Sequence, residues 1–483
     1  MVDLNIASQF SQTCRVIPVF KNTDIQDVFK QLELPNSIAQ QAQAFHFSGQ
    51  VGQILPCNYE QEKIILLGLG ALEQPLARNI EKAFEQLAKT FNEWQISSFD
   101  LLVDGIDDEH ITTIVQYISQ HIVNGLYVFD CLKSEKQQSY VKQVTLITAQ
   151  ADNPELEQSM QLGRAMGIGQ SYAKDLKNLP ANICTTQYMF DQAKTMANDQ
   201  AHCQFSYVDK EQMEKLGMGC LLGVAQGSDS PAYIANIEYQ GAKTDEKPIV
   251  LVGKGLVFDS GGLCLKPRDS MGSMKMDMGG AAGVLGTMRA IMELQLPINV
   301  VGTVVLVENV IGSKAYRPSD VLTSMNGTTV EVGNTDAEGR LALCDTLTYI
   351  EKYQPKQVVD VATLTGAIIV GLGNDLNGLM GNHQAFIDTL LDSGKQTGDY
   401  GWQLPLHEPY FELMKSDVAD TNNIGGMPAG SITAGLFLSR FTKKYQWAHI
   451  DVAGTAMGDF QKSKATGRPV PMLTHYIATQ ANS

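Results

Sequence analysis

Short apolar runs alternate with helical patterns along much of this chain. In its second half, four such runs are expected to be strands: 247–255, 298–309, 357–366 and 447–455. Between them, apolar residues recur at helical spacing over 281–295, 341–353 and 431–445. Strands that are apolar throughout are typical of parallel sheets buried beneath helices on both faces. The pattern therefore predicts an α/β fold in which ligands bind outside the carboxyl ends of the strands.

The first third of the chain repeats this pattern on a smaller scale. We predict strands at 62–70 and 141–149 and a helix over 79–91. Asn79 is expected to cap that helix. A longer helical pattern over 153–179 follows. Because 483 residues suffice for more than one core, we predict an N-terminal α/β domain over 1–152, a linking helix over 153–180, and a larger α/β domain over 181–483 with a mostly parallel central sheet covered by helices.

Charge and cysteine content exclude several classes of protein. The formal net charge of −16 argues against a general nucleic-acid or anionic-membrane surface. No apolar stretch reaches the about 18–20 residues that a membrane span needs, and the opening residues do not resemble a signal peptide. The eight cysteines are scattered without a CxxC pair, as expected of reduced thiols in a cytosolic protein. We therefore expect a cytoplasmic protein.

One group of charged residues follows the predicted strand at 247–255. The segment 253–283, which begins within the end of that strand, contains, among many glycines, Lys254, Asp259, Lys266 and Asp277. Asp259 lies in "FDSGG", where two glycines permit a tight turn. Asp277 precedes a helical pattern, so one interpretation is that it simply caps the helix. Taken singly, each acid fits a turn or a cap.

A second group lies in "NTDAEGR" at 334–340, directly before an apolar run. It places Asp336, Glu338 and Arg340 within five residues. Alone, the motif is consistent with a solvated loop at the start of a helix. The side chains of Asp336 and Glu338 can nevertheless point the same way if the backbone between them is extended. The decisive question is whether the two groups of charges meet.

If they meet, four carboxylates need cations to balance their charge: Asp259, Asp277, Asp336 and Glu338. Carboxylate oxygens are suitable ligands for Mg²⁺ and Mn²⁺, and they also bind Zn²⁺. A site with two such ions activates water, polarises a carbonyl and holds the leaving end of a substrate. Basic residues would stabilise a developing oxyanion, and a lysine beside two cations would have a lowered pKa and become a neutral ligand. The basic residues here are Lys254, Lys266 and Arg340.

These segments strongly resemble the leucyl aminopeptidase family of two-metal exopeptidases, the cytosol aminopeptidases. The resemblance rests on "VGKGLVFDSGGLCLKP", "MKMDMGGAAGV" and above all "NTDAEGR", which is the signature of the family. It extends to "WAHIDVAGT" and "ATGRPVP" and so covers most of the second domain. The N-terminal third resembles the family only in layout. By this resemblance, the domain at 181–483 is the catalytic one.

The resemblance implies a set of metal ligands, matched by motif position. Lys254 and Asp277 would bind one metal ion. Asp259 and Glu338 would bridge the two ions. Asp336 would bind the second ion through its carboxylate and its backbone oxygen. The expected cofactors are therefore two divalent ions per subunit, Zn²⁺ and/or Mn²⁺.

The same resemblance implies residues that act on the substrate. Lys266 would contact the substrate carbonyl or the reaction intermediate. Arg340 would hold a bicarbonate ion that serves as the general base. Met274, Thr363 and Gly366 match apolar pocket positions of the family, which implies a preference for hydrophobic N-terminal residues such as leucine.

The function implied is a metal-dependent aminopeptidase that releases N-terminal residues, preferably leucine and other hydrophobic ones, from peptides by two-metal activation of water. The free α-amine of the substrate would bind one metal ion, which would restrict cleavage to the first peptide bond. Members of the family are typically homohexamers, so the partners expected are peptide substrates and copies of this chain.

Two other functions fit part of the pattern. A metal-dependent phosphoesterase would also use two ions, but such sites often include imidazole ligands, and none of the eight histidines falls within 253–283 or 334–340. Some bacterial relatives in the family bind DNA. That function would need a basic stripe, whereas the N-terminal third contains only scattered lysines.

Overall fold

The computed structural model describes residues 2–21, 35–71, 76–107, 109–243, 245–459 and 464–481. The chain divides into two compact units, Met1–Ser171 and Tyr172–Ser483. The division falls within helix α5 (Pro154–Asn178), which confirms the long helix expected at 153–179. The domain boundaries at 152 and 180 stay a prediction. Within the described residues, no helix is both long and apolar enough to cross a membrane.

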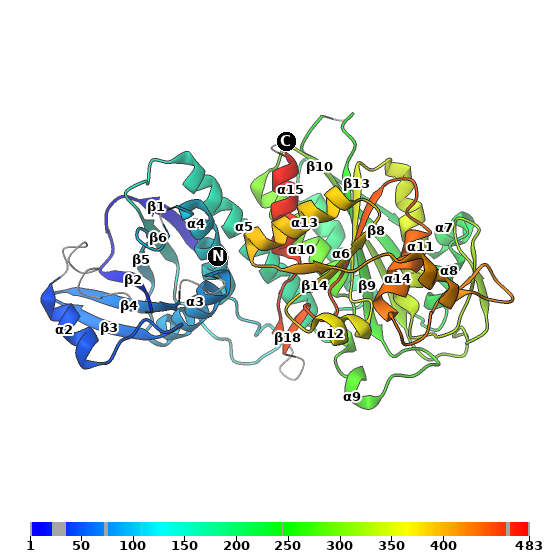
Figure 1. Cartoon of the computed structure of the whole chain (residues 1–483), viewed down its shortest axis with the longest axis horizontal. Helices are drawn as coiled ribbons and strands as arrows, with labels where there is room; N and C mark the ends of the chain where they lie inside the picture. The colour runs from blue at the N-terminus through cyan, green and yellow to red at the C-terminus, as the bar shows by residue number, and fades with distance from the viewer. Residues whose placement is uncertain are drawn as a thin grey trace. The chain divides into compact units, whose positions relative to one another are not determined.

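The N-terminal unit is built on one mixed sheet (Figure 1), whose described strands lie in the order β1-β6-β5-β2-β4-β3. All neighbours are parallel except β3 and β4, which are antiparallel. The strands span Asp3–Ala7 (β1), Cys14–Phe20 (β2), Ile54–Tyr59 (β3), Glu62–Gly70 (β4), Ser98–Leu102 (β5) and Gln143–Ile147 (β6). The strands expected at 62–70 and 141–149 are thus confirmed as β4 and β6.

Helices pack on this sheet: α2 (Asn36–Ala44), α3 (Leu76–Glu93) and α4 (Ile111–Gly125). Helix α3 confirms the helix expected at 79–91, but it begins three residues earlier. The prediction that Asn79 caps it is wrong, because Asn79 is 6% exposed inside the helix. Its side-chain amide donates instead to the carbonyl of Ala71, 3.2 Å away.

The larger unit contains a sheet whose described strands lie in the order β15-β14-β17-β13-β9-β10-β8-β7. The four central strands β17, β13, β9 and β10 are mutually parallel, as predicted, while β14 and β8 run antiparallel to their central neighbours. The strands span Cys203–Val208 (β7), Tyr233–Gln240 (β8), Ile249–Asp259 (β9), Asn299–Asn309 (β10), Gln357–Ala362 (β13), Asn377–Gly381 (β14), Gly401–Gln403 (β15) and Gln446–Asp451 (β17).

Two small sheets and a set of helices complete the larger unit. The short strands are Val321–Thr323 (β11), Thr329–Glu331 (β12), Thr421–Asn422 (β16), Met457–Asp459 (β18) and Lys464–Ala465 (β19). The α-helices are Thr186–Asn198 (α6), Lys210–Leu216 (α7), Gly219–Ala225 (α8), Arg268–Met271 (α9), Gly279–Leu294 (α10), Glu338–Tyr349 (α11), Gly366–Leu372 (α12), Gln384–Thr397 (α13), Gly430–Ser439 (α14) and Val470–Ala481 (α15). Single 3-10 turns span Met274–Met276, Ile350–Tyr353 and Glu408–Met414.

Helices cover both faces of the central sheet. On β9, Gly253 faces α10, because a Cβ built at Gly253 would lie 2.6 Å from the Cα of Ala281. Lys254 is the next residue in the strand and therefore points to the opposite face. There, β9, β13 and β17 share a buried core with α8, α11 and α14. This covered, centrally parallel sheet is the α/β architecture predicted from the sequence.

Candidate active site

Six of the seven predicted charged residues, all but Arg340, line one pocket at the carboxyl ends of β9, β10 and β13. This pocket has a volume of about 730 Å³. The residues that line it are Lys254, Asp259, Lys266, Pro267, Asp269, Ser270, Gly272, Ser273, Met274, Met276, Asp277, Asp336, Glu338, Thr363, Leu364, Thr365, Gly366, Ile369 and Ala453. The two groups of charges that the sequence separates therefore do meet in space.

Lys254 joins two of the carboxylates. Its Nζ lies 2.9 Å from Oδ2 of Asp277 and 2.9 Å from Oε1 of Glu338. All three side chains are buried. The interpretation of Asp277 as a simple helix cap is wrong, since α10 begins at Gly279 without a side-chain cap. The Asp277 carboxylate instead accepts hydrogen bonds from Lys254 and from the hydroxyl of Thr363, at 2.9 and 2.8 Å.

Lys266 joins the other two carboxylates. Its Nζ lies 2.9 Å from Oδ2 of Asp259 and 2.5 Å from Oδ1 of Asp336. Asp259 is the last residue of β9, whereas Asp336 precedes α11 by one residue. Each lysine therefore bridges one residue of the β9–α10 region and one residue of the "NTDAEGR" motif.

Two glycines allow these segments to approach one another. Gly261 has a φ of +85°, which side-chain-bearing residues rarely adopt, and a Cβ there would lie 2.9 Å from Oδ1 of Asp336. A Cβ at Gly339 would lie 2.6 Å from Cε of Lys254. The glycines of "FDSGG" and "DAEGR" are thus required by close packing at the site itself.

Three uncharged residues that were not predicted hold the loops in place. Asn309, at the end of β10, donates to Oδ1 of Asp259 at 2.8 Å and to the carbonyl of Thr335 at 3.0 Å. The Thr335 hydroxyl donates to the carbonyl of Gly261 at 2.6 Å. Asn423 donates to the carbonyl of Asn334 at 2.8 Å. Asn309 has a usable sequence signal, because it is a polar residue at the carboxyl end of an apolar strand, as Asp259 is.

Arg340 lies in the first turn of α11 and is 7% exposed. Its Nη1 donates to the carbonyl of Asn423 at 2.7 Å. Its Nε has no hydrogen-bond partner in the part of the chain that the structure describes. Burial lowers the pKa of Arg340 to about 10, which leaves the guanidinium charged at neutral pH. Arg340 therefore offers a buried cation with an unused donor close to Glu338.

The three expected pocket residues take different positions. Met274 and Gly366 line the pocket, together with the apolar side chain of Ile369. Thr363 also lines it, but its polar groups are engaged with the charged cluster. Its carbonyl accepts from Nζ of Lys254 at 3.0 Å, and its hydroxyl donates to Asp277. Thr363 is thus a support for the charged groups rather than an apolar wall alone.

The charges within the pocket strongly affect one another. Burial raises the pKa of Asp259 to about 6 and raises the pKa of Asp277 well above its usual value. Burial acts in the same direction on Glu338, but Lys254 and Lys266 hold its pKa below the usual value. Burial alone would lower the pKa of both lysines, yet the surrounding carboxylates raise it. Divalent cations that bind these carboxylates would remove the interactions that stabilise the lysine charge. The lysine pKa would then fall, and the neutral amine could bind a metal ion.

The residues present fit divalent cations. Four carboxylates face two ammonium groups, so the pocket carries excess negative charge. One oxygen each of Asp259, Asp336 and Glu338 lie within 4.8 Å of one another. Oε2 of Glu338 is buried and has no hydrogen-bond partner among the described residues. Because an unpartnered buried carboxylate oxygen is costly, this oxygen-rich donor set suits ions that prefer oxygen ligands.

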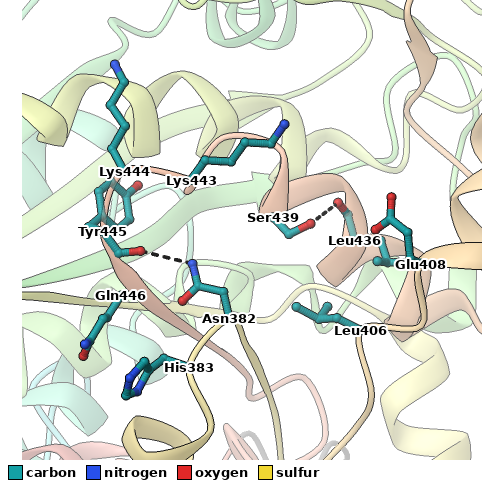
Figure 2. A pocket seen from close by; sticks show the side chains of 10 residues that line it. All are labelled: Asn382, His383, Leu406, Glu408, Leu436, Ser439, Lys443, Lys444, Tyr445 and Gln446. Atoms are coloured by element: carbon teal, nitrogen blue, oxygen red, sulfur yellow. Dashed lines mark hydrogen bonds between the residues drawn. The ribbon is translucent and has the colours of Figure 1, made fainter.

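A second depression, of about 600 Å³, lies elsewhere on the larger unit between Asn382 and His383, α14 and the segment 443–446 (Figure 2). Most of its charges are already paired. Lys444 contacts Glu351 at 2.6 Å, and Glu408 pairs with Arg440. Among its described lining residues, Glu408 is the one carboxylate, so this depression lacks the ligands of a metal site.

A carboxylate-rich pocket at the strand ends of an α/β fold is the kind of site that metal-dependent hydrolases use. Comparison with protein-family models identifies the family. The model for the catalytic domain of the cytosol aminopeptidase family matches residues 171–474. The model for the N-terminal domain of the same family matches residues 16–136. The chain belongs to the cytosol aminopeptidase family, which confirms the resemblance inferred from its motifs.

Individual relatives agree with this assignment. The cytosol aminopeptidase of Pseudomonas aeruginosa is 45% identical over 445 residues, which cover 90% of this chain and 89% of that protein. The probable cytosol aminopeptidase of Idiomarina loihiensis is 41% identical over 484 residues, or 97% and 96% of the two chains. A solved structure of a mutant tomato leucine aminopeptidase is 30% identical, with a TM-score of 0.89, and the match covers 99% of this chain and 97% of that one. The enzyme is therefore an aminopeptidase, a metal-dependent hydrolase that acts on peptides.

Proposed function

We propose that this aminopeptidase uses two divalent cations to release leucine and other hydrophobic residues from the N-termini of peptides. One observation carries the proposal. Four carboxylates and two lysines meet in a single pocket that also has an apolar wall. The apolar wall would receive the side chain of the first residue, while the charged side would act on its peptide bond.

Each ligand has a position that suits its proposed role. Lys254 and Asp277, which contact each other, would hold one cation. Asp336 would hold the other cation through its carboxylate and backbone oxygen. Asp259 and Glu338 would hold both cations, which is supported by the unpartnered Oε2 of Glu338. When bound, two divalent cations would supply Lewis acidity that activates water and polarises the scissile carbonyl.

The remaining groups would act on the substrate. Lys266 is partly exposed to the pocket and would donate a hydrogen bond to the developing oxyanion. Arg340, a buried cation whose Nε has no partner within the described part of the chain, would hold a bicarbonate ion that takes a proton from the attacking water. Met274, Gly366 and Ile369 would enclose an aliphatic side chain and exclude water from it.

The setting of the enzyme is also a proposal. We propose Zn²⁺ or Mn²⁺ as the cations, the cytoplasm as the compartment, and a homohexamer as the assembly. Several large apolar side chains are exposed on the surface of the catalytic unit, and self-association would bury such side chains. The most exposed are Met427 at 94%, Val370 at 90%, Val418 at 68% and Trp402 at 63%.

A panel of aminoacyl chromogenic amides tests the proposal. The purified protein would be treated with a chelator and then assayed with and without added Zn²⁺ or Mn²⁺. We expect leucyl and methionyl amides to be hydrolysed well above lysyl and aspartyl amides, and only when metal is restored. A preference for charged first residues would contradict the proposed pocket.

A further inference from the structure

The last residue of β17, Asp451, is a carboxylate that is 1% exposed and lies outside the proposed ligand set. Its oxygens accept hydrogen bonds mainly from the turn that follows β13. Oδ1 accepts from the backbone N–H of Leu364 at 3.1 Å and from that of Ala453 at 3.1 Å. Oδ2 accepts from the hydroxyl of Thr365 at 2.7 Å. Asp451 therefore fixes residues 364 and 365 from behind the pocket.

Thr363, in the same turn, forms hydrogen bonds with two of the proposed metal ligands. The carbonyl of Thr363 accepts from Nζ of Lys254 at 3.0 Å. The hydroxyl of Thr363 donates to Oδ1 of Asp277 at 2.8 Å. Because residues 363–365 are consecutive, a shift at Leu364 would be transmitted to Thr363 and so to both ligands. Asp451 touches neither ligand, and any effect on them must pass through this turn.

The turn also begins one wall of the pocket. Thr365 caps α12, since its hydroxyl oxygen accepts from the backbone N–H of Ile368 at 3.2 Å. It also shares a hydrogen bond of 2.7 Å with the hydroxyl of Ser431 on α14. The first turns of α12 carry Gly366 and Ile369, which line the pocket. Asp451 thereby orders the start of α12, which forms the apolar wall of the pocket, as well as the turn 363–365, which contacts the proposed metal ligands.

Burial and the neighbouring His449 act in opposite directions on the charge of Asp451, and the pKa of Asp451 is raised overall. His449 lies on the same face of β17, two residues earlier. Its Nδ1 is 2.6 Å from Oδ1 of Asp360. Burial acts to lower the pKa of His449, but Asp360 and Asp451 raise it. Burial raises the pKa of Asp451, whereas His449 and its hydrogen-bond donors act to lower it, and Asp451 in turn favours the charge of Arg340.

We propose that Asp451 is a positioning residue for this enzyme, which holds Lys254 and Asp277 in the geometry that binds one cation by fixing the turn 363–365. The proposal rests on the two-cation function proposed above. Groups that orient metal ligands typically affect metal affinity by about 10–100-fold when they are removed. A merely structural carboxylate would lower stability without this selective effect.

The test is the Mn²⁺ affinity of the metal-free protein, measured by isothermal titration calorimetry. For Asp451→Ala we expect one of the two binding events to weaken by about 10–100-fold, with a lower kcat at saturating Mn²⁺. Asp451→Asn keeps the shape and one oxygen acceptor, so it should recover most of the affinity. Asp399→Ala is the matched control for Asp451→Ala, because Asp399 is also a buried carboxylate and contacts Arg468 and Asn377 instead. This control should bind both ions as the wild type does.

A second pair of variants keeps the test decisive if Asp451→Ala does not fold. Thr365→Val removes the hydroxyl that donates to Asp451 at nearly constant volume, whereas Thr365→Ser retains it. We expect the valine variant to weaken one Mn²⁺ site and the serine variant to preserve it.

Two results would overturn the positioning role. One is a folded Asp451→Ala or Thr365→Val protein that binds two Mn²⁺ ions with wild-type affinity and wild-type kcat. The other is an equal loss of affinity in Asp451→Ala and Asp399→Ala, which would indicate general destabilisation. A wild-type protein that binds fewer than two ions would instead overturn the proposed two-cation function, and the positioning role with it.

Discussion

Nζ of Lys254 lies 2.9 Å from Oε1 of Glu338, which links the interior of β9 to the first turn of α11. Both side chains are buried, and Gly339 leaves the space that the lysine stem occupies. A carboxylate at this depth is not a solvated helix-start acid. The relationship instead places Glu338 at the centre of the proposed cation site, where its second oxygen has no hydrogen-bond partner among the described residues.

Replacing Glu338 should therefore affect metal content, whereas replacing Arg340 should not. Glu338→Ala removes a proposed ligand of both cations, so metal content and rate should fall together. Arg340→Ala removes only a proposed anion holder, so two ions should remain while the rate falls by about 10²–10⁴-fold, the usual range for lost general-base assistance. Added bicarbonate should recover part of that rate. Elemental analysis of the two variants side by side provides the measurement.

The same two variants would also show if Glu338 is not a metal ligand. If Glu338 only begins a helix, its loss would leave both ions bound and cost roughly 0.5–1 kcal/mol of stability through the helix dipole. Equal metal content with near-normal rates in both variants would show that "NTDAEGR" is a structural loop and not part of a metal site.

Blocking the substrate amine should abolish turnover. On the proposed function, a free α-amine is needed at the cation site, and an acetyl group removes both its lone pair and its charge. We expect an N-acetylated leucyl peptide to be cleaved at less than about one hundredth of the rate of the free peptide, the scale of losing one catalytic interaction. Liquid chromatography of the products provides the measurement. Similar rates for the two peptides would indicate an endopeptidase or a broader amidase.

A buried acid away from the pocket should make stability depend on pH. Burial raises the pKa of Asp345 to about 7 from its usual 3.8, although backbone N–H groups of Leu221 and Met325 donate to it. The folded state thus holds a proton that the unfolded chain releases, so this contribution is full below pH 3.8 and is lost as the pH rises to about 7. Between pH 5 and pH 8, the loss is at most about 3 kcal/mol.

Melting temperatures of the wild type and Asp345→Asn at pH 5 and pH 8 test this effect. The wild type should lose more stability than the variant across this interval, because only the wild type carries the titrating group. Equal losses in the two proteins would show that Asp345 is already ionised at pH 5 in the fold.

The sequence predicts the charged part of the site well, for a physical reason. Asp259 directly ends an apolar strand, and the carboxyl ends of neighbouring parallel strands lie at one edge of a sheet. An acid at the end of an apolar strand can therefore be identified from the sequence as a candidate site residue. The central strands β9, β10, β13 and β17 are predominantly apolar, which made them predictable. The short flanking strands β14 and β15 carry too few residues for a clear period.

Sequence rules for helix caps and turns give the wrong role where a residue's partners are distant in the sequence. An aspartate just before a helix usually caps it, yet Asp277 is taken by Lys254 and Thr363. Asn423 and Thr335 are ordinary turn residues in sequence, and their contribution is visible only once their distant partners are known. Asp451 is similar, since two of its hydrogen bonds, from Leu364 and Thr365, come from a segment that only the fold brings close to it.

The most direct test of the account is a titration of the metal-free enzyme with Mn²⁺, in which bound metal and hydrolysis of a leucyl amide are followed together. We predict that the metal-free protein is inactive, that binding saturates at two ions per chain, and that activity rises as the sites fill. Full activity without metal, or saturation at fewer than two ions, would contradict the two-cation site.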